Sequence, residues 1–302
     1  MFDVAIVGAG PAGLTASLYS ARYGLKTIVF EAFDPVSQLS MASRIENYPG
    51  FEGSGIELLE RMKEQALKAG AEIRTEKIVK IVKKDYGFLL IGEKEYEARA
   101  VIIATGGRHR SAGFENEDAF VGRGVSYCAT CDGALYRGKN VIVYGSGREA
   151  VSDAIYLHDI GCNVKLISRS PLRVEKAMLD ELFKRGIEII ANANLRRVEG
   201  KGRVERVVVF LRDKKEKIAM DCDAVFVAIG MRPVTSLAAE LGVELDSMGY
   251  IKVDREQKTN VPGVFAAGDC CNNPLKQVVT ACGDGAIAAF SAYKFLKGSA
   301  QA

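Results

Sequence analysis

Short apolar runs alternate with amphipathic stretches of helical length along most of the 302-residue chain. Runs such as 4–7 (VAIV) and 141–144 (VIVY) have the length and β-branched content of buried strands. Between such runs, stretches such as 55–69 and 176–185 place apolar residues at helical spacing. Alternation of strands and helices predicts parallel sheets crossed by helices. We therefore expect an α/β fold.

The pattern occurs twice. Residues 3–32 and 140–170 each contain an apolar run, a glycine turn, a helical stretch and a second apolar run. Two later segments, VIIATG at 101–106 and VFVAIG at 225–230, also resemble each other. The last stretch, 263–297, follows the second copy and has no counterpart in it, so we expect it to return to the first domain. The sequence thus predicts two Rossmann-like domains, the second inserted into the first.

Glycine-rich and polar segments near 106–113 and 242–249 are the expected linkers between these domains. The first domain is predicted to contain residues 1–110 and 245–302. The inserted domain is predicted to contain residues 111–244. A chain of this length suits two domains, because single cores tend to split beyond roughly 250–300 residues.

Charged residues make up 26% of the chain, and its 41 basic and 38 acidic residues are mixed along the sequence. Nucleic-acid binding gains no support from this pattern. No uninterrupted apolar run approaches the roughly 20 residues that span a bilayer, so we expect no membrane span. The chain begins directly on an apolar run, with no basic and apolar leader before it, and we expect a cytoplasmic protein.

The first copy carries a dinucleotide fingerprint, G-x-G-x-x-G, as Gly8, Gly10 and Gly13. Glycine lets the backbone approach a pyrophosphate, and the helix N-terminus supplies free N–H donors. Glu31 closes the second strand, where a carboxylate can accept from ribose hydroxyls. The alternative is a tight turn with close helix packing and no ligand. The residues predicted to bind this nucleotide are Gly8, Gly10, Pro11, Ala12, Gly13 and Glu31.

The second copy has Gly145 and Gly147, with Ala150 in the third position, which the fingerprint allows. In the place of Glu31 it has Ser168, followed by two arginines. A carboxylate there would repel a ribose 2′-phosphate, whereas serine and arginine can bind one, so this site should prefer NADP to NAD. Alternatively, the arginines lie on a solvated helix start. The predicted residues are Gly145, Gly147, Arg148, Ser168, Arg169, Arg173 and, in the later apolar segment, Gly230.

A C-x-x-C motif, Cys128 and Cys131, lies just before the second glycine loop. In a reducing compartment, such a motif beside an α/β pattern indicates redox chemistry. Four residues in a first helical turn bring the two sulfurs within disulfide reach, and a helix N-terminus favours the thiolate. Half of a zinc site is the structural alternative, but the chain has no second C-x-x-C and no suitably spaced histidine pair to complete it.

Asp132 directly follows the cysteine pair and can transfer the proton of a leaving thiol. Its alternative role is to stabilise the helix dipole. His109 and His158 are expected at the surface. Cys270 and Cys271 are a second redox candidate as an adjacent pair. By default, however, the cysteines outside the motif are expected to be buried small apolar residues, namely Cys162, Cys222, Cys270, Cys271 and Cys282.

Taken together, these motifs resemble the low-molecular-weight thioredoxin reductases, the class II pyridine nucleotide-disulfide oxidoreductases, from residue 2 to about 296. The resemblance rests on CATCDG at 128–133, ATG at 104–106 and G-x-x-A-A-G-D at 263–269. It implies FAD in the first domain, NADPH in the inserted domain and a homodimer. The further FAD-contacting residues that it implies are Gln38, Leu39, Asn47, Thr105, Gly106, Gly268, Asp269, Gln277 and Val278.

Two segments depart from the family pattern. Val36-Ser37-Gln38-Leu39 stands where Gly-Gly-Gln-Leu is common, so the loop over the adenine side of FAD is expected to differ. Ser168-Arg169-Ser170 stands where the family has His-Arg-Arg, and Arg173 comes slightly early. NADH, ferredoxin or a deazaflavin therefore stay open as alternative electron donors.

The resemblance also implies a relay. Cys131 would face the flavin, and Cys128 would attack the disulfide of thioredoxin or a glutaredoxin-like dithiol protein. Asp132 would transfer the proton, and the inserted domain would rotate about its linkers between the two reactions. A different class of function is a nucleotide-sensing module in which the cysteines are only a regulatory switch. The second cofactor site argues against this module, because a sensor does not need it.

Overall fold

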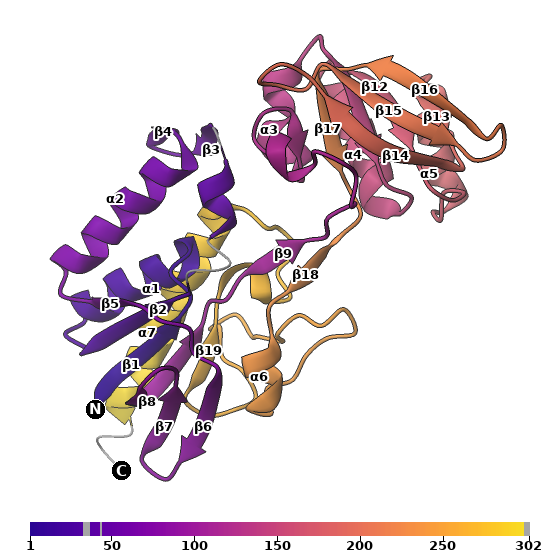
Figure 1. Ribbon diagram of the computed structural model, residues 1–302. Helices are drawn as coiled ribbons and strands as arrows, with labels where there is room; N and C mark the ends of the chain where they lie inside the picture. The colour runs from indigo at the N-terminus through magenta and orange to yellow at the C-terminus, as the bar shows by residue number, and fades with distance from the viewer. Residues whose placement is uncertain (33–36, 43, 299–302) are drawn as a thin grey trace. The chain divides into compact units, whose positions relative to one another are not determined.

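The computed structural model describes residues 1–32, 37–42 and 44–298 (Figure 1), so Val36 of the departing loop lies outside the described residues. The chain forms two compact units. Unit 1 comprises Met1–Arg108 and Arg232–Ala302, and unit 2 comprises His109–Met231. The chain leaves unit 1 within β9 (Gly107–His109) and returns to it within β18 (Met231–Pro233).

The central sheet of unit 1 has the strand order β5-β2-β1-β8-β7-β6, and β19 pairs with β8. Strands β5, β2, β1, β8 and β19 run parallel to one another, whereas β7 pairs antiparallel with β8 and β6 pairs antiparallel with β7. The bounds are β1 Phe2–Val7, β2 Thr27–Glu31, β5 Glu72–Thr75, β6 Lys80–Lys84, β7 Gly87–Ile91, β8 Glu95–Ile103 and β19 Val264–Ala266.

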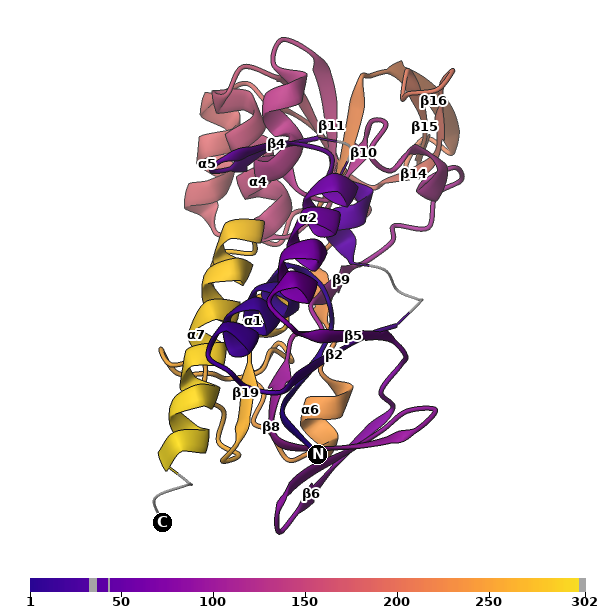
Figure 2. The same ribbon diagram turned by 90° about the vertical axis from the view of Figure 1, so that its left-hand side faces the viewer.

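Helices α1 and α2 of unit 1 begin where the sequence supplies a start signal. Pro11 opens α1, and the Ser54 side chain caps α2 by accepting a hydrogen bond from the Glu57 amide at 3.2 Å. Figures 1 and 2 both show α1 beside α7, and the two helices are in contact. The remaining bounds are α1 Pro11–Arg22, α2 Gly55–Lys68, α6 Ser236–Glu240, α7 Val278–Gly298, the 3₁₀ segments η1 Gln38–Met41 and η4 Gly268–Cys270, and the hairpin β3 Ile45–Tyr48 with β4 Phe51–Gly53.

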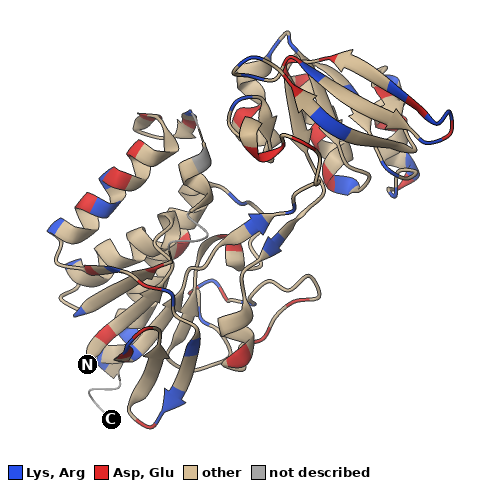
Figure 3. Cartoon of the chain, viewed as in Figure 1, with Lys and Arg blue, Asp and Glu red and all other residues tan. Residues whose placement is uncertain are grey.

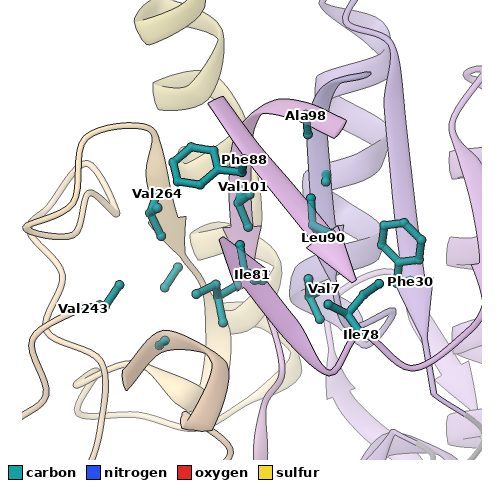
Figure 4. Packing of buried hydrophobic residues seen from close by; sticks show 14 of the residues in the cluster. Val7, Phe30, Ile78, Ile81, Phe88, Leu90, Ala98, Val101, Val243 and Val264 are labelled. Carbon is teal, nitrogen blue, oxygen red and sulfur yellow. The ribbon is translucent and has the colours of Figure 1, made fainter. Parts of the chain in front are cut away.

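Strand β1 is buried on both faces, as expected for a central parallel strand. Val4 and Ile6 pack in the cluster formed with α1 and α7. Ala5 and Val7 belong to a second cluster on the opposite face, which the β6–β7 hairpin and the segment after α6 complete. Figure 4 shows Phe88 and its neighbours in this second cluster. The glycine loop after β1 is therefore attached to a rigid strand.

Helix α6 belongs to unit 1, because Ala238 and Val243 are buried in its second cluster. Residues 232–244 accordingly lie in unit 1, whereas the domain boundaries expected from sequence placed them in the inserted domain. The glycine-rich segment at 242–249 lies within unit 1 and is not a connection between the units.

Unit 2 contains a parallel sheet in the order β10-β17-β11-β12-β13 and an antiparallel sheet in the order β14-β15-β16. The strand bounds are β10 Val125–Ser126, β11 Asn140–Tyr144, β12 Asn163–Ile167, β13 Glu188–Ile190, β14 Ala193–Glu199, β15 Arg206–Leu211, β16 Glu216–Asp221 and β17 Ala224–Val227. The helical segments are η2 Asp118–Phe120, α3 Ala129–Asp132, η3 Gly133–Tyr136, α4 Arg148–Asp159 and α5 Lys176–Lys184.

The parallel sheet of unit 2 is also covered on both faces. Val141 and Val143 of β11 face α4 and α5, whereas Ile142 and Tyr144 face the antiparallel sheet. Figure 2 shows α4 and α5 next to each other and β14–β16 on the other side of the parallel sheet. The order β11–α4–β12 reproduces β1–α1–β2, so the α/β fold with two Rossmann-like units expected from the repeat is confirmed.

Charged residues of both signs are interspersed on the two units (Figure 3). Within the described ranges, no helix is both long enough and apolar enough to cross a membrane.

Substitution of Leu90 by Ala should destabilise unit 1. Leu90 is fully buried in the second cluster, so the variant loses apolar burial and leaves a cavity. We expect the free energy of unfolding to fall by about 2–5 kcal/mol in urea denaturation followed by circular dichroism. Leu67→Ala on α2 is the matched control, because Leu67 is 48% exposed. Equal losses in the two variants would contradict the assignment of this core.

Candidate active site

The first glycine loop is folded closely against the end of β8. Gly8 has a φ of +106°, and a Cβ built on it would collide with the carbonyl of Ala104. A Cβ on Gly13 would collide with the carbonyl of Gly8 itself. Gly10 is different, because the one described atom close to a Cβ built on it is Ser37 Oγ, at 3.4 Å. Gly10 is the N-cap of α1, and among the described residues no side-chain cap bond is formed at this helix start, so its first N–H groups can bind a phosphate.

Glu31 lies at the end of β2 beside this loop, where its carboxylate accepts a hydrogen bond from the Ala9 amide. Burial raises the pKa of Glu31, while the Ala9 bond and Lys63 lower it. Pro11 opens α1, and Ala12 is buried behind it. The structure thus brings together the residues predicted to bind the first nucleotide.

Other predicted flavin-site residues meet from distant parts of unit 1. The Asn47 side-chain amide donates to Gln277 Oε1 at 3.0 Å. Gln38 Nε2 donates to the carbonyl of Gly107, and Leu39 is buried in the cluster under η1. Val278, which follows Gln277, is the first residue of α7.

Thr105 and Gly106 follow β8 directly. The Thr105 hydroxyl donates to the carbonyl of Val234 at 2.5 Å, and Gly106 has a φ of +68° that glycine adopts without strain. This bond ties the ATG segment to the chain that returns from unit 2.

Asp269 lies in η4, after Gly268, and burial raises the pKa of its carboxyl, while Lys276 lowers it and Asp284 raises it further. Asp284 on α7 was missed by the sequence reasoning. Its carboxylate accepts from the Gly268 amide at 3.3 Å and from Gln257 Nε2 at 3.2 Å. The signal that could have revealed it is a single carboxylate in a helix otherwise rich in small and apolar residues. Asp284 holds the Gly268–Asp269 turn in place.

Cys128 and Cys131 form a disulfide, with their Cα atoms 5.3 Å apart. Cys128 is the N-cap of the short helix α3, and the Cys131 amide donates to Cys128 Sγ at 3.1 Å. The hydroxyl of Thr130 lies 3.5 Å from the same sulfur. The expected placement of the pair in a first helical turn is confirmed.

Asp132 closes α3, and its Oδ2 accepts a hydrogen bond from the Ser126 hydroxyl at 2.7 Å. Burial raises the pKa of the Asp132 carboxyl, and the bond from Ser126 lowers it. Ser126 Oγ also accepts from the Cys128 amide at 3.1 Å, so it ties the carboxylate to the redox pair. The sequence reasoning missed Ser126, because a serine at the end of β10 carries no motif.

The second glycine loop repeats the close packing of the first. A Cβ on Gly145 would collide with the carbonyl of Ala228, while one on Gly147 would meet nothing within 4 Å. Gly147 is the N-cap of α4, where the described part of the chain forms no side-chain cap bond, and Ala150 is buried. This helix N-terminus therefore also has free N–H donors and open space in front of them.

Two carboxylates on α4 were missed by the sequence reasoning. Glu149 accepts a hydrogen bond from the amide of Gly230, and burial raises the pKa of its carboxyl. Burial, with the charge of Glu149, raises the pKa of Asp153 to about 7. Acidic residues in the first turns of a helix are common stabilising features, so their positions alone did not single them out. Arg148, at the start of the same helix, pairs with Glu175.

The residues predicted to favour NADP divide into two groups. Ser168 is fully buried, and its hydroxyl donates to the carbonyl of Ser170 at 2.7 Å, so the structure does not present it to a ligand. Arg169 is exposed. The Arg173 amide donates to the carbonyl of Ser146 at 2.9 Å, which places exposed Arg173 next to the second glycine loop.

His109 is not the surface residue that we expected. Its ring stacks on Tyr127, with 5.1 Å between the ring centroids and 15° between the planes, and burial lowers its pKa to about 4. Tyr127 in turn donates to Glu117.

Four free cysteines are buried thiols, as expected, namely Cys162, Cys222, Cys270 and Cys271, while Cys282 is only partly buried. Among the described residues, no three His, Cys, Asp or Glu side chains form a cluster that could hold a metal ion.

Comparison with known proteins agrees with this arrangement. The family model described as pyridine nucleotide-disulphide oxidoreductase matches residues 2–285. The chain belongs to this family. Membership implies a flavin and a nicotinamide nucleotide as cofactors, and the two open glycine loops fit two nucleotides.

Relatives within the family are named thioredoxin reductase. The protein of Treponema pallidum is 42% identical, over 98% of this chain and 97% of its own length. The protein of Listeria monocytogenes is 40% identical, over 98% of this chain and 94% of its own length. The crystal structure of thioredoxin reductase from Streptococcus pyogenes superposes with a TM-score of 0.95 at 37% identity, over 99% of each chain. The resemblance inferred from the motifs is confirmed.

Substitution of Gly13 by Ala should abolish flavin binding, because its Cβ collides with the Gly8 carbonyl and displaces the loop. We expect the purified variant to lose the visible flavin absorption. Gly147→Ala is the control in the second loop. Apart from its chain neighbours, no described atom lies within 4 Å of the added Cβ, so this variant should retain the flavin absorption. Normal flavin content in Gly13→Ala would show that the first loop does not hold the flavin.

Proposed function

We propose that the chain is a thioredoxin-disulfide reductase that passes electrons from NADPH, through FAD and the Cys128–Cys131 pair, to thioredoxin or a glutaredoxin-like dithiol protein. The observation that carries this proposal is the disulfide in unit 2. It lies before β11 and the second glycine loop, and Ser126 connects it to the half-buried Asp132. The names of the relatives support the choice of substrate.

The first glycine loop has the features that FAD requires. Gly10 and the N-terminus of α1 would hold the pyrophosphate, Glu31 the adenosine ribose, and Asn47 with Gln277 the flavin end. When bound, FAD supplies the electron transfer between a nicotinamide and a disulfide. The role of this chain is to position the group and to exclude competing reactions.

NADPH is the donor that the second loop supports best. No carboxylate ends β12, where the first copy has Glu31, and the exposed Arg169 and Arg173 can attract a 2′-phosphate. NADH lacks this phosphate. The open N-terminus of α4 at Gly147 also gives ferredoxin or a deazaflavin no support as the donor, because it fits a dinucleotide.

Cys128 is the nucleophile toward the protein substrate. The Cys131 amide points at Cys128 Sγ, and the Thr130 hydroxyl lies beside it, so both groups stabilise a thiolate on this sulfur once the disulfide is opened. Cys131, by contrast, is an interior residue of α3.

Reduction of the partner is a dithiol–disulfide exchange. The Cys128 thiolate attacks one sulfur of the partner's disulfide, a mixed disulfide forms, and the other partner sulfur leaves and takes up a proton. Cys131 then attacks Cys128 Sγ and releases the second partner thiol. Two electrons thereby move from the Cys128–Cys131 dithiol to the partner, and the enzyme disulfide is restored.

Asp132 supplies the proton in this exchange. Burial keeps its carboxyl protonated to higher pH than that of a free aspartate, and it lies in the same helical turn as both sulfurs. The bond from Ser126 holds the carboxyl in one orientation.

The two cysteines should differ in a trapping experiment. The partner is a thioredoxin that lacks its resolving cysteine and carries a thionitrobenzoate disulfide. Cys131→Ser should form a stable mixed disulfide through Cys128 and release the thionitrobenzoate anion, whereas Cys128→Ser should react at least tenfold more slowly. Both variants should bind flavin normally.

Equal reaction of the two variants would contradict the role of Cys128. If the wild-type holoenzyme binds both nucleotides but turns over no dithiol protein, the chain is instead the nucleotide-sensing module.

Asp132→Asn should lower the rate of thioredoxin reduction by about 10²-fold, since general acid catalysis is typically worth this much. The wild-type rate of the proton-dependent step should fall as pH rises through the raised pKa of Asp132. Asp132→Asn should lack this decline of the rate with pH. Ser126→Ala removes the bond that lowers this pKa and should shift the decline to higher pH.

Asp221→Asn is the control, because Asp221 is an exposed carboxylate of the same unit. An unchanged pH profile in both Asp132→Asn and Ser126→Ala would rule out Asp132 as the proton donor.

A further inference from the structure

Unit 2 places two arginines outside the motif region close to the end of β12. Arg196 is on β14, at an irregularity in the register between Leu195 and Arg197. Arg212 directly follows β15. Neither belongs to the segment 168–173, in which the sequence pattern locates the recognition of a 2′-phosphate.

Backbone hydrogen bonds connect these positions to the end of β12. The Ala193 amide donates to the carbonyl of Ser168 at 2.9 Å, so the start of β14 lies against the residue that precedes Arg169. The Arg212 amide donates to the carbonyl of Asn192, also at 2.9 Å. Arg169 and Arg212 therefore come from neighbouring backbone segments, although they are far apart in the sequence.

The charges of all three arginines affect one buried side chain, Tyr144. Burial raises the pKa of Tyr144, at the end of β11, and the positive charges of Arg169, Arg212 and Arg196 each lower it. The backbone bonds place Arg169 and Arg212 on segments beside the end of β12, and Arg196 is on β14, which begins there. This is the edge of an open α/β sheet where ligands bind.

The positive charge at this edge is not neutralised. All three arginines are exposed, and within the described part of the chain none of them has an ion-pair partner. Phe210 lies under the Arg196 guanidinium, with 5.2 Å between the guanidinium carbon and the ring centroid, and limits its orientation. Asp213 follows Arg212 in the sequence, but the hydrogen bond that its carboxylate accepts comes from Asn192, at 3.3 Å, and not from an arginine. An anion is therefore the ligand that this edge favours.

We propose that Arg196 and Arg212, together with Arg169, bind the 2′-phosphate of the donor nucleotide. The proposal rests on the proposed function, in which this donor is NADPH. Ser168 is buried and Ser170 carries no charge, so the segment Ser168-Arg169-Ser170 has fewer positive charges than the family pattern His-Arg-Arg. Arg196 and Arg212 replace these positive charges, and they come from the antiparallel sheet of the same unit. They are specificity-determining residues and take no part in the chemical step.

The test compares two probes that differ only in the 2′-phosphate. Binding of 2′,5′-ADP and of 5′-AMP to the flavin-loaded protein is measured by isothermal titration calorimetry. The wild-type protein should bind 2′,5′-ADP more tightly. Arg212→Ala and Arg196→Ala should each weaken 2′,5′-ADP binding by about tenfold, because each loses a charge-assisted contact, and should leave 5′-AMP binding unchanged.

Arg197→Ala is the matched control. Arg197 neighbours Arg196, but its guanidinium pairs with Glu199 at 2.6 Å, so the variant should bind both probes as the wild type does. Circular dichroism of each variant verifies that the fold is retained.

The outcomes separate this inference from the proposed function. If Arg169→Ala weakens 2′,5′-ADP binding while Arg196→Ala and Arg212→Ala do not, the inference is overturned and NADPH stands as donor. Equal weakening of both probes in the variants also overturns it. If the wild-type protein does not distinguish the two probes and reduces thioredoxin with NADH as well as with NADPH, both the inference and the choice of donor fail, while the disulfide relay stands.

Discussion

Both nucleotide loops depend on one steric constraint, the close approach of a glycine backbone to a carbonyl at the end of a neighbouring strand. Gly8 lies against Ala104, which follows β8, and Gly145 lies against Ala228, which follows β17. Any side chain at either glycine would push the loop away from the sheet. The constraint therefore sets where α1 and α4 begin, and with them the free N–H groups that can hold a phosphate.

The redox chemistry is built onto the second of these units. A short helix holds the disulfide, and one buried serine, Ser126, joins the Cys128 amide to the Asp132 carboxylate. Burial raises the pKa of this carboxyl, and the Cys131 amide points at the sulfur of Cys128. The residues that we propose as proton donor and as nucleophile, Asp132 and Cys128, thus lie within one helical turn. Such an arrangement makes each cysteine suited to a different step of the exchange.

The local motifs could be predicted from the sequence because they are encoded by adjacent residues. The glycine loops, the C-x-x-C turn and the duplicated βαβ unit belong to this kind. The roles of Asp284 and Ser126 could not be predicted, since they depend on contacts made when distant segments pack. Ser168 illustrates the opposite case, in which the sequence pattern assigned a binding role to a side chain that the fold buries. The boundary near residue 231 was missed because α6 packs on unit 1.

The transfer of electrons from NADPH to the dithiol of Cys128 and Cys131 can be measured directly. The holoenzyme is mixed with excess NADPH without oxygen and quenched with an alkylating reagent, and the peptide that contains both cysteines is analysed by mass spectrometry. We expect both cysteines to be alkylated after NADPH and neither before it. Reduction of the flavin with both cysteines still unalkylated would contradict the disulfide relay.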